Sequence, residues 1–230
     1  GVLYMGGGTA VQKAAGFDDS PEEMWKYLLY ASGPGPDEAK VQAFCEGSLE
    51  HFAWIVQQGV EFKPVFYPHY SGEPPNDDGL VYSGNENAWP YNEVAQPAPR
   101  GHVPRIDGAA GGLLMRTLLS RVEDAGIHVQ GDALCEGLVQ RDDGSIAGAV
   151  ARIGGERVAI GASGGVVVTT GGFINNDEML ALHAPLLKRC TFRVGAEGDD
   201  GSGIRMGVGA GGAVIRMDAA ECAIPLTPPR

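Results

Sequence analysis

Residues 166–173 read Val166-Val167-Val168-Thr169-Thr170-Gly171-Gly172-Phe173. The apolar, β-branched run Gly165–Thr170 is typical of a strand buried on both faces of a parallel sheet. The Thr-Gly-Gly turn that follows places small residues at the carboxyl end of the sheet, where α/β folds bind ligands. Two interpretations stay open: the glycine pair admits the phosphate or ribose of a ligand, or the segment is a plain strand-to-helix turn. Under either one, the segment predicts an α/β fold.

The residues just before this run predict a small antiparallel meander. Asp142-Asp143-Gly144 is a turn sequence that joins two of its strands. The predicted strands are Ile127–Val129, Ala133–Gln140, Ser145–Ile153 and Arg157–Gly161. Beyond the run, Asn175 or Asn176 is expected to cap a short helix through Leu182, and Ala213–Met217 is strand-like.

Three helices are predicted closer to the N-terminus. Ser20 is a good N-cap, Pro21 suits the first helical position and Glu23 completes a capping box. A second helix spans about Asp37 to Gln58, because its apolar residues recur at spacings of three and four. A third runs from about Gly112 to Ala125.

The stretch 60–110 between the second and third helices is irregular, and it is rich in Pro, Gly, Asn and aromatic residues. A structureless loop of this length is uncommon inside a compact domain and is usually functional when it is ordered. We therefore expect a covering excursion whose aromatic side chains pack on a neighbouring surface.

Composition excludes several classes of partner. The 230 residues carry a net charge of −12, which repels phosphate backbones, so we expect no nucleic acid partner. No apolar run approaches the roughly 20 residues of a membrane span. The cysteines and histidines are dispersed, so no metal site is expected, and free thiols suit a cytoplasmic protein.

Three polar or glycine-rich features carry alternatives. The run Gly6–Thr9 is either a loop that brings backbone amides to an anionic or flat ligand, or merely a turn. The segment Gly198–Met206 is either a ligand loop leading into a helix or a solvated turn. His102 is either a proton carrier or phosphate contact, or a structural side chain.

Five stretches, in this order, resemble FAD-dependent oxidoreductases of the fumarate reductase and 3-ketosteroid dehydrogenase superfamily. The resemblance is closest to the 3-ketosteroid Δ4-(5α)-dehydrogenase type and covers nearly the whole chain. The stretches are Gly1–Thr9, Asp78–Gly84, Pro97–Pro104, Val166–Phe173 and Asp199–Met206.

The resemblance implies FAD as the cofactor and assigns residues to it. Gly1 and the loop of Gly6, Gly7, Gly8 and Thr9 match the segment beside the flavin. Cys135 matches a meander position whose backbone meets the adenine. Thr170, Gly171 and Gly172 match the turn beside the adenosine half, and Asp200 matches an acid that contacts FAD.

The resemblance also implies a domain layout. Residues 1–220 would be the central part of a Rossmann-like, glutathione-reductase-like FAD domain with its β-meander. This part would lack the N-terminal dinucleotide-binding strand and the C-terminal part. Residues 221–230 would begin a substrate domain, in which Ile224 and Leu226 are apolar where fumarate reductases carry a dicarboxylate-binding His.

These expectations favour hydride transfer from an apolar, ketosteroid-like substrate to the flavin. Two alternatives are a reductase of a small unsaturated acid and an inactive truncated product. No catalytic residue is assigned, and the sequence names no electron acceptor. The chain taken by itself is expected to bind FAD weakly, because the pyrophosphate site would lie outside it.

Overall fold

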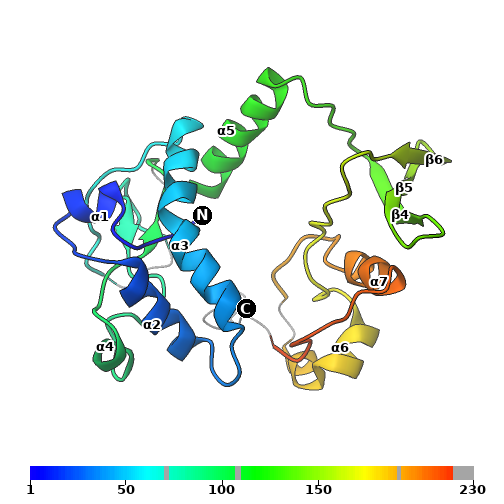
Figure 1. Cartoon of the computed structure of the whole chain (residues 1–230). Helices are drawn as coiled ribbons and strands as arrows, with labels where there is room; N and C mark the ends of the chain where they lie inside the picture. Colours follow the sequence, from blue (N-terminus) through cyan, green and yellow to red (C-terminus); the bar gives the residue numbers. More distant parts are fainter. Residues whose placement is uncertain (70–72, 107–109, 191–192, 220–230) are drawn as a thin grey trace, which may run out of the picture. The chain divides into compact units, whose positions relative to one another are not determined.

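The computed structural model describes residues 1–69, 73–106, 110–190 and 193–219 (Figure 1). The chain divides into two compact units, Gly1–His128 and Val129–Arg230, each of which is described by itself. Within the described ranges, no helix combines the length and the apolar content needed to cross a membrane. Whether residues 1–220 form one FAD domain stays a prediction, and residues 221–230, with Ile224 and Leu226, lie outside the described part.

The N-terminal unit is mainly helical, and its two longest helices before residue 60 pack side by side (Figure 1). The helices are α1 (Ala10–Ala14), α2 (Pro21–Ala31), α3 (Glu38–Gln57), α4 (Tyr91–Val94) and α5 (Ala110–Asp124). The predictions of α2, α3 and α5 are confirmed. The helices α1 and α4 were not predicted, because each is too short to show a hydrophobic period.

Side chains cap the first helices of this unit. Thr9 and Gln12 form a reciprocal capping box at α1. At α2, the predicted N-cap is confirmed, because the Ser20 hydroxyl accepts from the Glu23 amide at 3.2 Å. The predicted capping box is wrong, because the Glu23 side chain is bonded to Lys26 and to the Gln96 amide instead of the Ser20 amide. The Glu23 carboxylate accepts from the Gln96 amide at 2.7 Å, so it ties α2 to the irregular stretch.

A small antiparallel sheet joins the N-terminus to the stretch 60–110. Its strands are β1 (Leu3–Tyr4), β2 (Leu80–Val81) and β3 (Gly101–His102), in the order β1-β3-β2. The main core lies beside it and consists of Met5, Val11, Phe52, Ile55, Val60 and Leu80. The stretch is therefore anchored by short strands within an otherwise irregular path.

Aromatic side chains of the stretch pack on α3 and on the segment between α1 and α2, as expected. Phe62 lies 5.1 Å from Phe52 of α3, and Phe66 lies 5.0 Å from Phe17, measured between ring centroids. Burial of such rings is a large apolar contribution to stability. Among the described aromatic residues of the stretch, Trp89 differs, because 78% of its surface is exposed.

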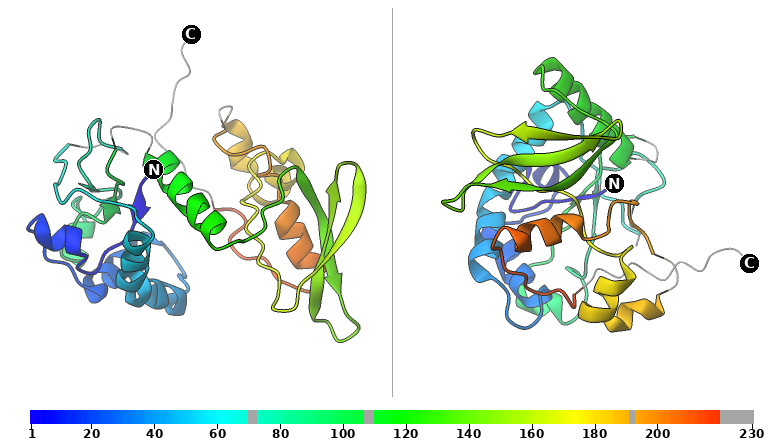
Figure 2. Two further views of the ribbon diagram at one scale, coloured as in Figure 1. Left: turned by 90° about the horizontal axis from the view of Figure 1, so that it is seen from above. Right: turned by 90° about the vertical axis from the view of Figure 1, so that its right-hand side faces the viewer.

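The C-terminal unit contains the predicted meander and a helix against it (Figure 2). Its strands β4 (Ala133–Gln140), β5 (Ile146–Ile153) and β6 (Glu156–Gly161) pair in sequence order, and every pair is antiparallel. The helices are α6 (Asp177–His183), the short 3₁₀ helix η1 (Pro185–Arg189) and α7 (Ser202–Gly209). Asn176 caps α6 by accepting from the Met179 amide.

Three predicted strands are wrong. Ile127–Val129, Gly165–Thr170 and Ala213–Met217 belong to no strand. No described strand pairs with Gly165–Thr170, and Val167 is 87% exposed. A strand needs a hydrogen-bonded neighbour, so an apolar run without one forms no strand. The described fold is mixed α and β with antiparallel sheets, rather than the parallel sheet that this run predicted.

Candidate functional site

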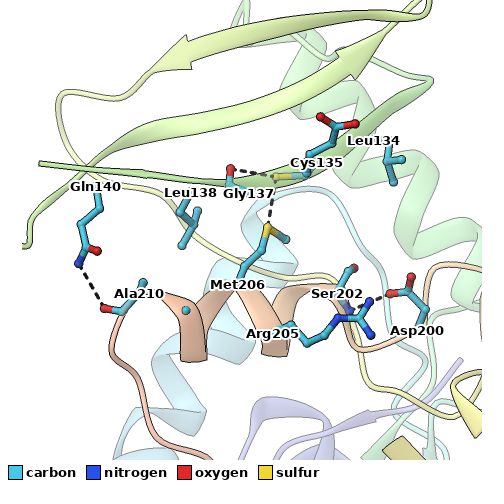
Figure 3. Close-up of a pocket in the computed structure, with 12 residues that line it drawn as sticks. Leu134, Cys135, Gly137, Leu138, Gln140, Asp200, Ser202, Arg205, Met206 and Ala210 are labelled. Carbon is cyan, nitrogen blue, oxygen red and sulfur yellow. Dashed lines mark hydrogen bonds between the residues drawn. The ribbon is translucent and has the colours of Figure 1, made fainter. Parts of the chain in front are cut away.

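A groove of about 650 Å³ lies in the C-terminal unit between β4 and α7 (Figure 3). Its volume is within the range of small-molecule sites. Its walls combine the apolar side chains of Leu134, Leu138 and Met206 with polar groups toward the ends. Such a surface can bind an apolar ring, with polar groups available at either end.

One face of α7 forms the floor of the groove. Ser202, Arg205, Met206 and Gly209 line it at helical spacings of three and four residues. The helix starts after Gly201, whose φ of 77° lies in the left-handed region that favours glycine. These four residues therefore point to one side because of helix geometry alone.

Thr170 and its neighbours hold α7 in place. A Cβ on Gly203 would collide with Thr170 Oγ1, so α7 can approach Thr170 this closely only because Gly203 has no side chain. The Gly201 amide donates to Gly172 O at 2.9 Å. A Cβ on Gly171 would meet the Asp199 carboxylate. The predicted turn Thr170–Gly172 thus lies under the first turn of α7 rather than in the lining of the groove.

A β-bulge shapes the wall made by β4. Cys135 pairs with Ala151 and Gly137 with Val150, so Glu136 is the extra residue. Glu136 is held by Arg152 at 2.6 Å and by Arg157 at 2.8 Å, and these contacts lower its carboxyl pKa. The bulge fixes the β4 backbone at the point where Cys135 faces the groove.

Cys135 and α7 meet inside the groove. Cys135 Sγ lies 3.6 Å from Met206 Sδ and 3.9 Å from Gly137 O (Figure 3). The thiol is therefore directed toward the helix, and the β4 backbone on either side of it borders the groove. The role that the resemblance assigns to the Cys135 backbone stays a prediction.

The two ends of the groove are polar. Asp200 accepts from the Ser202 amide at 2.8 Å, and hydrogen bonding to Ser202, with Arg205 nearby, lowers the pKa of its carboxyl. At the other end, Gln140 Nε2 donates to Ala210 O at 3.4 Å. Asp200 is thus ionised at neutral pH and can accept a hydrogen bond from a ligand hydroxyl.

The loop Gly6–Thr9 in the N-terminal unit is buried, and its amides have internal acceptors. The Gly6 amide donates to Ser48 Oγ, and the Gly7 amide donates to Asp19 Oδ2. The amides of Gly8 and Thr9 both donate to Gln12 Oε1, and all four distances are 2.8–3.1 Å. This arrangement fits the alternative that the run is a turn. Gly1 is exposed, and a Cβ on it would meet Gly111.

Arg100 and Asp19 form a buried ion pair behind this loop. Arg100 Nη2 donates to Asp19 Oδ1 at 2.7 Å and Nε to Oδ2 at 3.1 Å, and both side chains are fully buried. The pair was not predicted, because its partners are 81 residues apart in the sequence.

His102 is a structural side chain. It is fully buried, and burial lowers its pKa from 6.5 to about 4. Nδ1 lies 3.1 Å from Arg100 O and must donate to it, so Nε2 accepts from the Thr9 hydroxyl at 2.8 Å. A neutral imidazole with both ring nitrogens hydrogen-bonded in this way is a poor proton carrier near pH 7.

Comparison with known proteins identifies the family. A family described as FAD binding domain matches residues 4–230. The chain belongs to this FAD binding domain family. Its cofactor is FAD, so the cofactor prediction is confirmed.

Solved and curated flavoproteins resemble the chain. The structure of 3-ketosteroid-Δ4-(5α)-dehydrogenase from Rhodococcus jostii RHA1, in complex with 4-androstene-3,17-dione, is 46% identical with a TM-score of 0.92. The match covers 95% of this chain and 46% of that one. A flavocytochrome c3 fumarate reductase in its open conformation is 25% identical with a TM-score of 0.73, over 91% and 33%. The acrylate reductase flavoprotein subunit of Shewanella woodyi is 26% identical over 86% of this chain and 36% of its own length.

The resemblance to the fumarate reductase and 3-ketosteroid dehydrogenase superfamily is therefore confirmed. The chain spans less than half the length of these relatives. Arg205 and Met206 lie in the segment Gly198–Met206, one of whose two interpretations was a ligand loop, and both line the groove. Sequence reasoning missed Gln140 as a lining residue.

Proposed function

We propose that the protein is an FAD-dependent oxidoreductase that dehydrogenates a CH–CH bond next to the ketone of an apolar, ketosteroid-like substrate. The observation that carries the proposal is the 46% identity and TM-score of 0.92 to a 3-ketosteroid-Δ4-(5α)-dehydrogenase. FAD, when bound, would supply the hydride acceptor. No residue of this chain is assigned as the base that takes the accompanying proton.

The groove fits the adenosine half of FAD. Its apolar walls can cover the two faces of an adenine ring, the β4 backbone around Cys135 borders it, and the ionised Asp200 can accept from a ribose hydroxyl. Thr170, Gly171 and Gly172 would act through α7, whose first turn they support.

The flavin half is assigned to the N-terminal unit. Gly1 and the residues Gly6–Thr9 would lie beside the isoalloxazine ring. The loop amides donate internally, so this assignment is supported by the resemblance alone. We also propose that residues 1–220 are the central part of a Rossmann-like FAD domain.

The substrate assignment rests partly on Ile224 and Leu226, which lie outside the described residues. Their apolar character suits a steroid better than a dicarboxylate. A cytoplasmic location is consistent with the free thiols of Cys45, Cys135 and Cys190.

A second candidate is an FAD-dependent reductase of a small unsaturated acid. The 26% identity to an acrylate reductase subunit favours it. Such an enzyme needs cationic side chains to bind the substrate carboxylate. An inactive truncated product is the remaining alternative.

The test is the visible absorption spectrum of the purified full-length reading frame before and after anaerobic addition of a saturated 3-ketosteroid. We expect a yellow protein whose flavin absorbance bleaches on addition. In parallel, the dithionite-reduced protein is mixed with acrylate or fumarate.

Each outcome separates the candidates. Bleaching by the steroid supports the proposal. Reoxidation by acrylate or fumarate, without bleaching by the steroid, would replace it with the small-acid reductase. A colourless, folded protein that takes up no FAD would overturn both.

A further inference from the structure

A group of buried polar side chains in the N-terminal unit has no role in the proposed function. Glu86 belongs to a surface loop whose neighbouring residues 83–85 and 87–89 are exposed, yet Glu86 itself is only 1% exposed. Its Oε2 accepts from the Gly84 amide at 2.9 Å. Its Oε1 has no hydrogen-bond partner within the described part of the chain.

Arg100 presents a second group of this kind. Two of its nitrogens are used by Asp19, and its guanidinium lies 5.4 Å from the centre of the Tyr27 ring. The third nitrogen, Nη1, is buried and makes no hydrogen bond to any described residue. A guanidinium N–H group that loses water without a replacement partner destabilises the fold.

Tyr4 connects these two groups. Tyr4 pairs with Gly101 across β1 and β3, directly beside Arg100, and its hydroxyl is buried. Burial raises the pKa of this hydroxyl, and the charges of Glu86 and Arg100 also act on it. Even so, it forms no hydrogen bond of acceptable geometry with a described residue. Tyr4 OH, Glu86 Oε1 and Arg100 Nη1 are thus three unpartnered polar atoms of one neighbourhood.

Buried polar atoms in native proteins nearly always have partners, so a shared partner is the economical explanation. The surrounding charges restrict its identity. An anion would be repelled by Asp19, and a cation would be repelled by Arg100. A neutral molecule that has both hydrogen-bond donors and acceptors is repelled by neither charge.

We propose that Tyr4, Glu86 and Arg100 form a binding site for a single internal water molecule. The water accepts from Arg100 Nη1, donates to Glu86 Oε1 and makes its third hydrogen bond with the Tyr4 hydroxyl. Three hydrogen bonds are the usual number for a buried water. This inference does not depend on the proposed function.

The water would connect three segments of the unit. Tyr4 belongs to β1, Arg100 directly precedes β3, and Glu86 comes from the surface loop. Tyr4 is also two residues before Gly6, where the buried loop Gly6–Thr9 begins. The site would therefore help to fix the entry to that loop.

Crystallography of the purified protein, at a resolution that shows ordered water, tests the proposal directly. We expect one density peak within hydrogen-bond distance of Tyr4 OH, Glu86 Oε1 and Arg100 Nη1. Direct hydrogen bonds from Tyr4 to Arg100 or Glu86, with no peak between them, would overturn it. A peak with the anomalous signal of chloride would also overturn it.

A solution measurement complements the crystal structure. Oxygen-17 magnetic relaxation dispersion counts long-lived internal waters. We expect one fewer in Tyr4→Phe than in the wild type, and an unchanged number in the control Tyr30→Phe, whose ring is exposed on α2. An equal count in wild type and Tyr4→Phe would contradict the proposal. If Tyr4→Phe does not fold, the density in the wild-type crystal decides.

Discussion

Asp19 accepts hydrogen bonds from two residues just before it in the sequence and from one residue far along the chain. Its carboxylate receives the Gly7 amide, Gln12 Nε2 and two nitrogens of Arg100. No sequence pattern near any of these residues indicates that it would hydrogen-bond to Asp19. Sequence reasoning therefore identified the glycine loop but not the buried carboxylate that holds it.

The ion pair leads to a prediction about single residues. Asp19→Asn leaves the Arg100 guanidinium buried without its counter-ion, and breaking a buried pair in this way costs about 3–5 kcal/mol. We expect the free energy of unfolding, measured in urea, to fall by this amount. The matched control is Asp18→Asn, because Asp18 is exposed and adjacent, and it should change stability by no more than about 0.5 kcal/mol. A loss below about 1 kcal/mol for Asp19→Asn would show that the pair is solvated in solution.

Elements with local signals were predictable, and those that depend on distant partners were not. The helices α2 and α3 and the meander β4–β6 have caps, turn residues or periodicity within their own segments. The run Gly165–Thr170 has the composition of a buried strand, but strand formation requires pairing that composition cannot supply. Likewise, the groove exists because α7 packs beside β4, about 70 residues away in the chain.

The packing of α7 leads to a prediction with an internal control. Gly203→Ala places a methyl group against Thr170, so we expect a loss of about 1–3 kcal/mol in stability. Gly207→Ala in the same helix meets no atom within 4 Å and should gain up to about 1 kcal/mol from helix propensity. Thermal unfolding of both variants measures the difference. Equal effects would mean that α7 does not pack on Thr170.

At the scale of the whole molecule, two buried ionisable groups make stability depend on pH in opposite directions. Burial lowers the pKa of His102 and raises that of Glu86. Stability from a group with a raised pKa is present below its unfolded pKa and is lost as the pH rises through the folded pKa. For His102 the lowered pKa has the reverse effect, so its contribution is lost on acidification.

The acid side of the stability profile is therefore expected to depend on His102. Its pKa is 6.5 when unfolded and about 4 when folded, so protons favour the unfolded chain between these values. Between about pH 7 and pH 5, the free energy of unfolding should fall by about 2 kcal/mol from this residue. Urea unfolding at a series of pH values measures the fall, which should be missing in His102→Gln and retained in the control His51→Gln, whose side chain is exposed. An NMR titration of the wild type provides an independent check, because a His102 pKa above about 6 would contradict the buried, neutral imidazole that bridges Thr9 and Arg100.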